Sequence, residues 1–401
     1  MKRSQQECPQ NIEFGSLFDY LKSAWKKGWL DDYSDDHFLI KAIENRLTDF
    51  VGIDQLIANN NNMLNIVQNQ KINFDAFCSI FCLNLSTKLH GLSETFGEKQ
   101  IERFIRDQLS AGKNNYREDA FFEALSEISV LSFLCGANWT KCEYEPPKSQ
   151  TCKKNPEAKF IYELENKKLV VNVEIKSPAF PHDNHKNDKI IIPTILLTEE
   201  GVKKIKDYCS NHDIIYLDPR VRKLCDFLNS AQSKFSNPGK DEFNLLYINW
   251  SYRDFSSNSF LEAWALLTNP LNGILTNPIY AKHFGIDDGV FSKISAIIVY
   301  TESLEGIMLQ SFHHVWQGSK IGPRFCMWVN DNLYDQENET GYLKQLFEIT
   351  SMNRSTNSNL MLLCDLKYHD YKSKCEAVDM GNEILRLVEF NALIIPSIAE
   401  L

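Results

Sequence analysis

The chain has 401 residues, 43% of them hydrophobic and 24% charged, and its formal net charge is −10 at pH 7. This composition is ordinary for a globular protein. The negative charge argues against a protein that coats nucleic acid with its whole surface. Residues 113–240, however, contain slightly more Lys and Arg than Asp and Glu. The charge distribution therefore permits a local phosphate-binding groove.

No apolar run in the sequence is long enough to span a bilayer. The first residues, Met1 to Glu7, lack the apolar segment of a secretory signal. We therefore expect a cytoplasmic protein with no membrane partner. The eleven cysteines are scattered, which in a reducing compartment indicates small buried apolar residues. Cys78 and Cys82 are one helical turn apart, but no matching Cys or His pair lies nearby to complete a zinc site.

Residues 1–112 have the pattern of a helical N-terminal domain. Apolar residues recur at helical spacing at Leu17, Leu21, Trp25 and Trp29, and again from Phe74 to Leu83. This region contains no catalytic motif, so we expect it to recognise a substrate or a protein partner. Residues 111–115, with the sequence Ala-Gly-Lys-Asn-Asn, predict a turn or linker before the next domain.

A helix is predicted from Arg117 to Gly136. Its apolar stripe consists of Phe121, Leu125, Ile128, Leu131 and Leu134. Gly136 is a typical residue for ending the helix. Glu123 and Glu127 are four residues apart and therefore share a face beside this stripe. Glu127 is the nearer of the two to the end of the helix that leads into the strands.

After this helix the periodicity changes from helical to alternating. The sequence predicts an edge strand at residues 139–145, a second strand after Asn155-Pro156-Glu157, a turn at 165–168 and a third strand at 169–176. In the third strand Glu174 and Lys176 point to one face, and Val171, Val173 and Ile175 point to the other. A buried strand that carries an acid and a lysine must either join them in an ion pair or employ them in a functional site.

The remaining elements predict a domain over residues 113–335 and a C-terminal α/β extension over residues 336–401. We expect a helix at 220–235 and strands at 243–250, 294–300, 325–329 and 360–364. His182 and His185 fall in a long insertion that follows the third strand. His313-His314 lies in a predicted helix and is interpreted as packing or surface.

The order helix, three strands, helix, strand, with acids on the helix and on the second and third strands, resembles the PD-(D/E)xK nuclease superfamily. The residues that carry the resemblance are Glu127 or Glu123, Pro156-Glu157, and Glu174-Ile175-Lys176. The resemblance implies an α/β fold with a restriction-endonuclease-like core, in which a mixed central sheet is flanked by helices. The chain differs from the usual family pattern in having Glu157 where an aspartate usually follows the proline.

The resemblance also implies a metal site. Glu127, Glu157, Glu174 and the backbone carbonyl of Ile175 would bind Mg²⁺ or Mn²⁺, which prefer oxygen ligands. Lys176 would orient or deprotonate the attacking water. The catalytic residues implied are therefore Glu127, Glu157, Glu174 and Lys176. The extra methylene of Glu157 would shift its carboxylate by about one C–C bond relative to an aspartate.

We therefore predict a metal-dependent nuclease that acts on nucleic acid, with DNA favoured, in restriction or phage defence. Gln232 and Lys234 lie on the helix where related nucleases sometimes place DNA-contacting residues. Arg222, Lys223 and Lys234 could bind phosphates or merely solvate the helix. The alternative is a catalytically inactive protein of this fold that binds nucleic acid or protein. Cutting both strands of a duplex would favour a homodimer.

Overall fold

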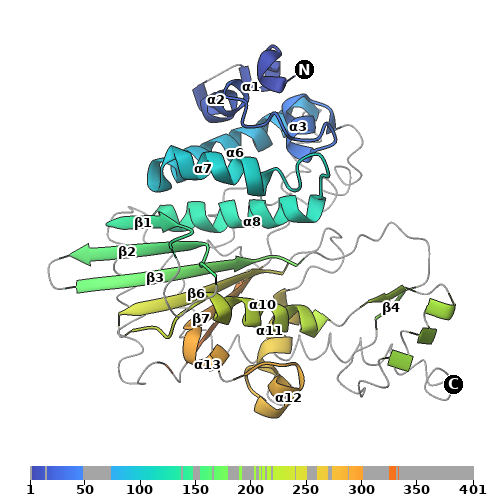
Figure 1. Ribbon diagram of the computed structural model, residues 1–401, viewed down its shortest axis with the longest axis vertical. Helices are drawn as coiled ribbons and strands as arrows, with labels where there is room; N and C mark the ends of the chain where they lie inside the picture. Colours follow the sequence, from blue (N-terminus) through green and yellow to red (C-terminus); the bar gives the residue numbers. More distant parts are fainter. Residues whose placement is uncertain are drawn as a thin grey trace, which may run out of the picture.

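The computed structural model describes residues 2–13, 16–47, 74–136, 139–147, 154–164, 167–178, 189–191, 203–204, 207–208, 210–212, 215–217, 220–239, 241–250, 260–269, 273–287, 289–300, 325–330 and 333. These residues form a mixed α/β structure in which helices cover both faces of a central sheet (Figure 1). The predicted α/β class, with a mixed sheet flanked by helices, is confirmed. The strand predicted at 360–364, and with it the C-terminal extension, lies outside the described residues.

Six strands form the central sheet in the order β1-β2-β3-β6-β7-β8. They are β1 (Lys141–Tyr144), β2 (Ala158–Leu164), β3 (Lys167–Lys176), β6 (Glu242–Asn249), β7 (Ala296–Tyr300) and β8 (Phe325–Val329). β1 pairs with β2 and β2 with β3 in antiparallel fashion, β3 pairs with β6 and β6 with β7 in parallel, and β8 is antiparallel to β7. The predicted edge position of β1 is confirmed. Two short parallel strands, β4 (Lys189–Ile191) and β5 (Ile215–Leu217), pair separately.

The described helices fall before the sheet and between its later strands. Those before it are η1 (Arg3–Gln5), α1 (Gln10–Glu13), η2 (Ser16–Phe18), α2 (Asp19–Lys26), α3 (Phe38–Ile43), α6 (Phe74–Phe96), α7 (Glu98–Phe104), the π-helical turn η4 (Ile105–Leu109) and α8 (Glu118–Cys135). The helices that lie between later strands along the chain are α10 (Arg220–Lys234), α11 (Phe260–Thr268), α12 (Pro278–His283) and α13 (Gly289–Lys293). None of the described helices combines the length and apolar character needed to cross a membrane.

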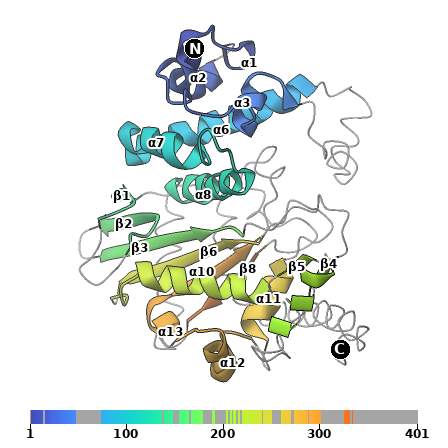
Figure 2. The ribbon, with the colours of Figure 1, turned by 45° about the vertical axis from the view of Figure 1, so that its right-hand side comes forward.

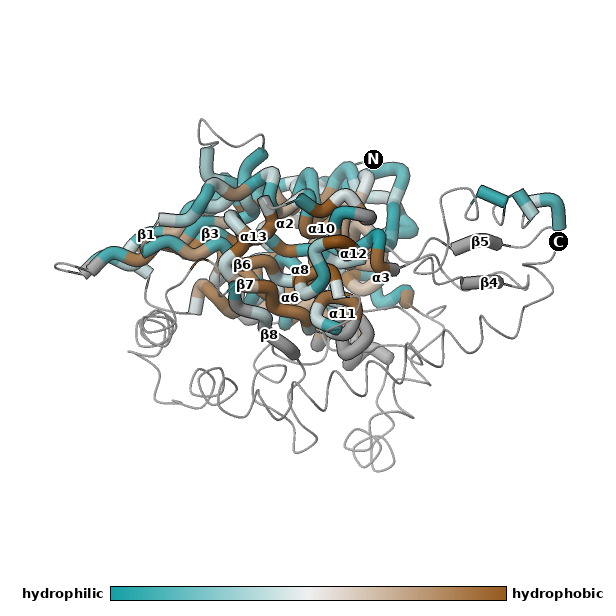
Figure 3. The backbone as a smooth tube through the Cα atoms, turned by 90° about the horizontal axis from the view of Figure 1, so that it is seen from below, coloured by the Kyte–Doolittle hydropathy of each residue, from teal (hydrophilic) through white to brown (hydrophobic). Residues whose placement is uncertain are grey.

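The two faces of the sheet belong to two different hydrophobic cores. Val171, Val173 and Ile175 of β3 pack in the core that contains α8 and the N-terminal helices. Leu246 and Ile248 of β6 pack in the other core, against α10, α11 and α13. Figure 2 shows α8 and α10 on opposite sides of the strands. Apolar segments gather around β6, β7 and α11, whereas the chain is more hydrophilic toward β1 (Figure 3).

The turn predicted at residues 111–115 is present and depends on Gly112. Its φ is +97°, and a Cβ at this position would lie 2.4 Å from the Asn115 carbonyl oxygen. Ala111 and Lys113 on either side also have positive φ values, of 50° and 57°. Glycine at the centre therefore allows the chain to reverse between η4 and α8, because any side chain there would collide with the backbone.

The helix α8 begins at Glu118 and ends at Cys135, close to the predicted bounds. Gly136 follows the last residue of the helix, as predicted, and its φ of −70° is right-handed rather than the left-handed value common for a glycine cap. The N-terminal helices also differ in one detail. α2 ends at Lys26, so Trp29 packs from the turn that follows and not from the predicted helix.

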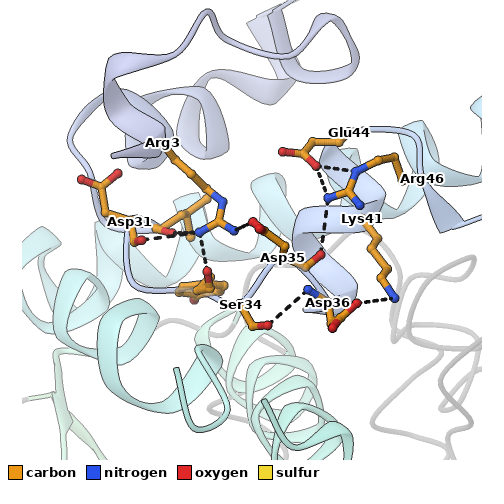
Figure 4. Close-up of polar contacts among 10 residues, drawn as sticks. Arg3, Asp31, Ser34, Asp35, Asp36, Lys41, Glu44 and Arg46 are labelled. Carbon is orange, nitrogen blue, oxygen red and sulfur yellow. Dashed lines mark hydrogen bonds and ion pairs between the residues drawn. The ribbon is translucent and has the colours of Figure 1, made fainter. Parts of the chain in front are cut away.

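A buried arginine ties the first residues to the turn before α3. Arg3 is 8% exposed, and its Nη1 donates to the carbonyl oxygens of Leu30 at 3.3 Å, of Asp31 at 3.4 Å and of Tyr33. Its Nη2 forms an ion pair with Asp35, as Figure 4 shows. These contacts satisfy several donors of the guanidinium, which is the condition for burying an arginine.

The larger core is continuous from the N-terminal helices to the sheet. Its buried residues extend from Ile12 in α1 through α8 to Tyr300 in β7. α8 covers one face of the sheet directly, α6 reaches the edge strand β1, and α2 and α3 pack on α6 (Figure 1). The predicted domain boundaries at residues 112 and 335 stay predictions.

Candidate functional site

The β2–β3 hairpin brings two glutamates together. Ala158 pairs with Val173, and the Glu157 N–H donates to the Val173 carbonyl oxygen at 3.0 Å. Because the strands are antiparallel, extending this register by one residue sets Glu157 opposite Glu174. Glu174 is fully buried, and the side chain of Glu157 is 15% exposed. Two of the predicted site residues thus lie side by side at one end of the hairpin.

Two lysines approach this glutamate pair. Lys176 Nζ lies 2.5 Å from Glu174 Oε1 and 3.9 Å from Glu157 Oε1. Lys234, the last residue of α10, lies 2.7 Å from Glu174 Oε1 and donates a hydrogen bond to Glu157 Oε1 at 2.8 Å. The contacts of both lysines with Glu174 are ion pairs. The result is a compact cluster of two carboxylates and two ammonium groups.

The environment perturbs the charged groups of this cluster. Burial raises the pKa of Glu174, and the neighbouring Glu157 raises it further, while Lys176 and Lys234 oppose the rise. Burial alone would lower the pKa of Lys234, but Glu157 and Glu174 outweigh burial and raise that pKa. Lys234 therefore carries a positive charge at neutral pH, held in place by its two carboxylate partners.

A buried asparagine fixes the end of α10 against the sheet. Asn244 of β6 donates through Nδ2 to the carbonyl oxygens of Ser236, just after α10, and of Lys293, at the end of α13, at 2.8 and 2.7 Å. Its Oδ1 accepts from Asn172 Nδ2 at 2.8 Å. Asn172 lies on the same face of β3 as Glu174. These bonds position the C-terminal turn of α10, and with it Lys234, over the glutamate pair.

Glu127 approaches from the other side of the sheet. It is 8% exposed on α8, and its Oε1 accepts a hydrogen bond from the Tyr144 hydroxyl at 2.9 Å. Burial raises its pKa well above the usual value, and the charges of Glu157, Glu145 and Glu174 add to the rise while Tyr144 opposes it. Glu127 therefore lies within electrostatic range of the pair, and its hydrogen bond is with β1 rather than with the lysines.

A chain of hydrogen bonds extends from Glu127 to the N-terminal helices. Gln108, in the π-helical turn, donates through Nε2 to the Tyr144 hydroxyl oxygen at 2.8 Å and to Glu145 Oε1 at 3.1 Å. Arg103 of α7 also contacts Glu145, whose backbone N–H donates to the Glu157 carbonyl oxygen at 2.8 Å. Because Gln108 donates to the tyrosine oxygen, the tyrosine hydrogen is free to point at Glu127.

The other predicted residues are more dispersed. Glu123 is exposed on α8, one turn before Glu127. Ile175 is buried, and its side chain points into the α8 core, away from the lysines.

On α10, Arg222 is exposed and Lys223 Nζ lies 5.5 Å from the centre of the Phe227 ring. Gln232 donates to Asn229 at 2.8 Å. His182, His185, His313 and His314 lie outside the described residues.

The sequence pattern placed Lys234 on a helix face open either to nucleic acid or to solvent, and did not place it between the two glutamates. It also missed Tyr144 and Gln108 altogether. Lys234 had a partial signal, since it ends an amphipathic helix that follows, after β4 and β5, the strand that carries Glu174. Tyr144 and Gln108 had none, because their importance depends on which segments the fold brings together.

The donor chemistry at the glutamate pair suits a hard divalent cation. Both carboxylates offer oxygen ligands, and Glu174 Oε2 is buried with no hydrogen-bond partner among the described residues. Magnesium commonly binds proteins through only one or two carboxylates and keeps several waters. Within the described ranges, no group of three or more His, Cys, Asp or Glu side chains is arranged to hold a metal ion. The larger ligand set that includes Glu127 therefore stays a prediction.

Comparison of the chain with protein-family models, with curated proteins and with solved structures finds no match. The interpretation of the site therefore depends on its own chemistry: two adjacent carboxylates, two lysines and a third buried glutamate within electrostatic range.

Proposed function

We propose that the chain is a metal-dependent nuclease of the PD-(D/E)xK type, with DNA as its favoured substrate and restriction or phage defence as its role. The observation that carries the proposal is the meeting of Glu157 and Glu174 across β2 and β3, with Lys176 2.5 Å from Glu174. The mixed sheet, with α8 on one face and α10 on the other, supports a restriction-endonuclease-like core.

In this proposal the protein supplies ligands and orientation. Glu157 and Glu174 would bind Mg²⁺ or Mn²⁺, with the Ile175 carbonyl as a further ligand. Once bound, such a cation would make a coordinated water more acidic and offset the charge of the phosphate. Lys176, whose side chain is 20% exposed, would donate a hydrogen bond that orients the attacking water. The partial exposure of Glu157 and Lys176 leaves an approach for a phosphodiester.

The test is cleavage of plasmid and oligonucleotide DNA with Mg²⁺ or Mn²⁺. Glu174→Ala and Lys176→Ala should each reduce the rate by about 10²-fold or more, since each removes a group that acts on the reacting atoms. Glu163→Ala and Lys168→Ala are matched controls on the same hairpin, because this exposed pair lies at its other end. The controls should cut at the wild-type rate. A wild-type protein that never cuts, or site variants that cut as well as the controls, would refute the assignment.

A second candidate is a non-catalytic protein of the same fold that binds nucleic acid or protein. The observation in its favour is that Lys176 and Lys234 already neutralise the two glutamates, so the cluster is electrically balanced without a cation. Mn²⁺ should raise the melting temperature of the wild type under the nuclease proposal, by mass action. It should leave that temperature unchanged under the second candidate. A rise that persists in Glu157→Ala with Glu174→Ala would place the metal elsewhere.

A further inference from the structure

Lys234 occupies a position for which the nuclease proposal gives it no role. Its Nζ lies 2.8 Å from Glu157 Oε1 and 2.7 Å from Glu174 Oε1, so one ammonium bridges the two carboxylates. Its side chain is only 12% exposed. Lys176, in comparison, is close to Glu174 alone, since its distance to Glu157 is 3.9 Å. Of the two lysines, Lys234 is thus the one that lies within hydrogen-bonding distance of both carboxylates.

We propose that Lys234 is a resident counter-ion that competes with a divalent cation for Glu157 and Glu174. This inference depends on the proposed metal site. A metal ion bound by both carboxylates would lie about 2.0–2.6 Å from their oxygens, depending on the ion. An ammonium nitrogen at 2.7–2.8 Å from one oxygen of each carboxylate already fills that space. A metal ion that binds these two Oε1 atoms cannot share that space with the ammonium, so Lys234 must move when such an ion binds.

The position of Lys234 in the fold makes this movement feasible. The residue is the last of α10, and the bonds of Asn244 hold the backbone beyond it, at Ser236. Displacing Nζ therefore requires only rotation about the four-carbon side chain, which is flexible in lysine. Rotation returns the ammonium toward solvent, where the phosphate of an arriving substrate is its natural new partner. Cation binding should therefore be weak in the free protein and stronger with a bound polyanion.

The test measures Mn²⁺ binding directly, by electron paramagnetic resonance of free Mn²⁺ and by calorimetry, in the absence of nucleic acid. Lys234→Met removes the ammonium and keeps most of the apolar stem, and it should bind Mn²⁺ about tenfold more tightly or better than the wild type. Lys234→Arg keeps the charge and should bind no more tightly than the wild type. Lys223→Met is the matched control, since it removes the same charge from the same helix at a site without a carboxylate ion pair among the described contacts. Its affinity should equal that of the wild type.

Lys234→Met leaves two buried carboxylates with one ammonium and could fail to fold, so Lys234→Gln provides a second neutral variant whose amide can still donate to Glu157. A cooperative melt verifies the fold of each variant. Equal Mn²⁺ affinity in wild type and both neutral variants, including no binding in any of them, overturns the inference. Cleavage is assayed separately. If the wild type cuts DNA but the neutral variants gain no Mn²⁺ affinity, only the competition by Lys234 is refuted. If the neutral variants gain Mn²⁺ affinity but no protein cuts DNA, only the nuclease proposal is refuted.

Discussion

Lowering the pH from 7 to 5 should destabilise the N-terminal helices through one buried histidine. His37 is fully buried, its Nδ1 accepts from the Leu39 N–H at 3.0 Å, and its Nε2 lies 3.0 Å from the Leu109 carbonyl oxygen. Both contacts are satisfied only by the neutral ring with its proton on Nε2. Burial lowers the pKa of His37 to about 3; the charge of Arg3 also lowers it, and the Leu109 carbonyl opposes the shift.

The size and sign of the effect follow from proton linkage. The unfolded chain, with an ordinary histidine pKa of about 6.5, binds more protons than the folded chain between pH 6.5 and 3. The contribution of His37 to stability is therefore complete above pH 6.5 and is lost as the pH falls, by about 1.4 kcal/mol per pH unit. Between pH 7 and pH 5 this loss amounts to about 2 kcal/mol.

Urea denaturation followed by tryptophan fluorescence can measure this loss, because Trp25 and Trp29 are buried in the same core. The comparison is with His37→Gln, which keeps a donor and an acceptor but does not titrate. The wild type should lose about 2 kcal/mol more than this variant between pH 7 and pH 5. His90→Gln, at an exposed histidine of α6, is the control and should follow the wild type. Parallel pH profiles for wild type and His37→Gln would refute the reasoning.

Two further predictions concern hydrogen bonds that position the site. Tyr144→Phe removes the donor to buried Glu127 and should lower the free energy of unfolding by about 1–3 kcal/mol. Tyr162→Phe on β2 is the control. Denaturation curves of Tyr144→Phe that coincide with those of the control would contradict this role. Asn244→Ala leaves the carbonyl oxygens of Ser236 and Lys293 without this donor and should cost about 1–3 kcal/mol. Hydrogen exchange should then show faster opening at the C-terminal turn of α10, and unchanged exchange there would count against the proposed positioning.

Much of the fold could be predicted from local patterns. The alternation in residues 169–176 identified the buried strand and the shared face of Glu174 and Lys176, because side chains in a strand alternate with a period of two. The apolar stripe of α8 identified that helix and its length. The order strand, turn, strand over residues 157–176 also indicated a hairpin, which the pairing of β2 and β3 confirms.

The contacts of Lys234 and Glu127 could not be predicted in this way. Lys234 meets Glu157 across 77 positions of sequence, and no local pattern specifies which helix end will cover a hairpin. Glu127 was expected beside the glutamate pair, but the choice between the lysines and Tyr144 as its neighbours depends on how α8 rotates against β1. The same limit applies to Gln108, which is defined as a site residue only by the tertiary structure.

The continuous core has a consequence for how the protein is made. Its members range from Ile12 to Tyr300, so helices that leave the ribosome first cannot complete their packing until most of the chain has been synthesised. Contacts of such large sequence separation slow folding, because a long loop must close before they form. During that interval the apolar side of α8 has no sheet to cover it and is open to aggregation. Expression at low temperature, or with a chaperone that shields apolar surface, should therefore increase the yield of folded protein.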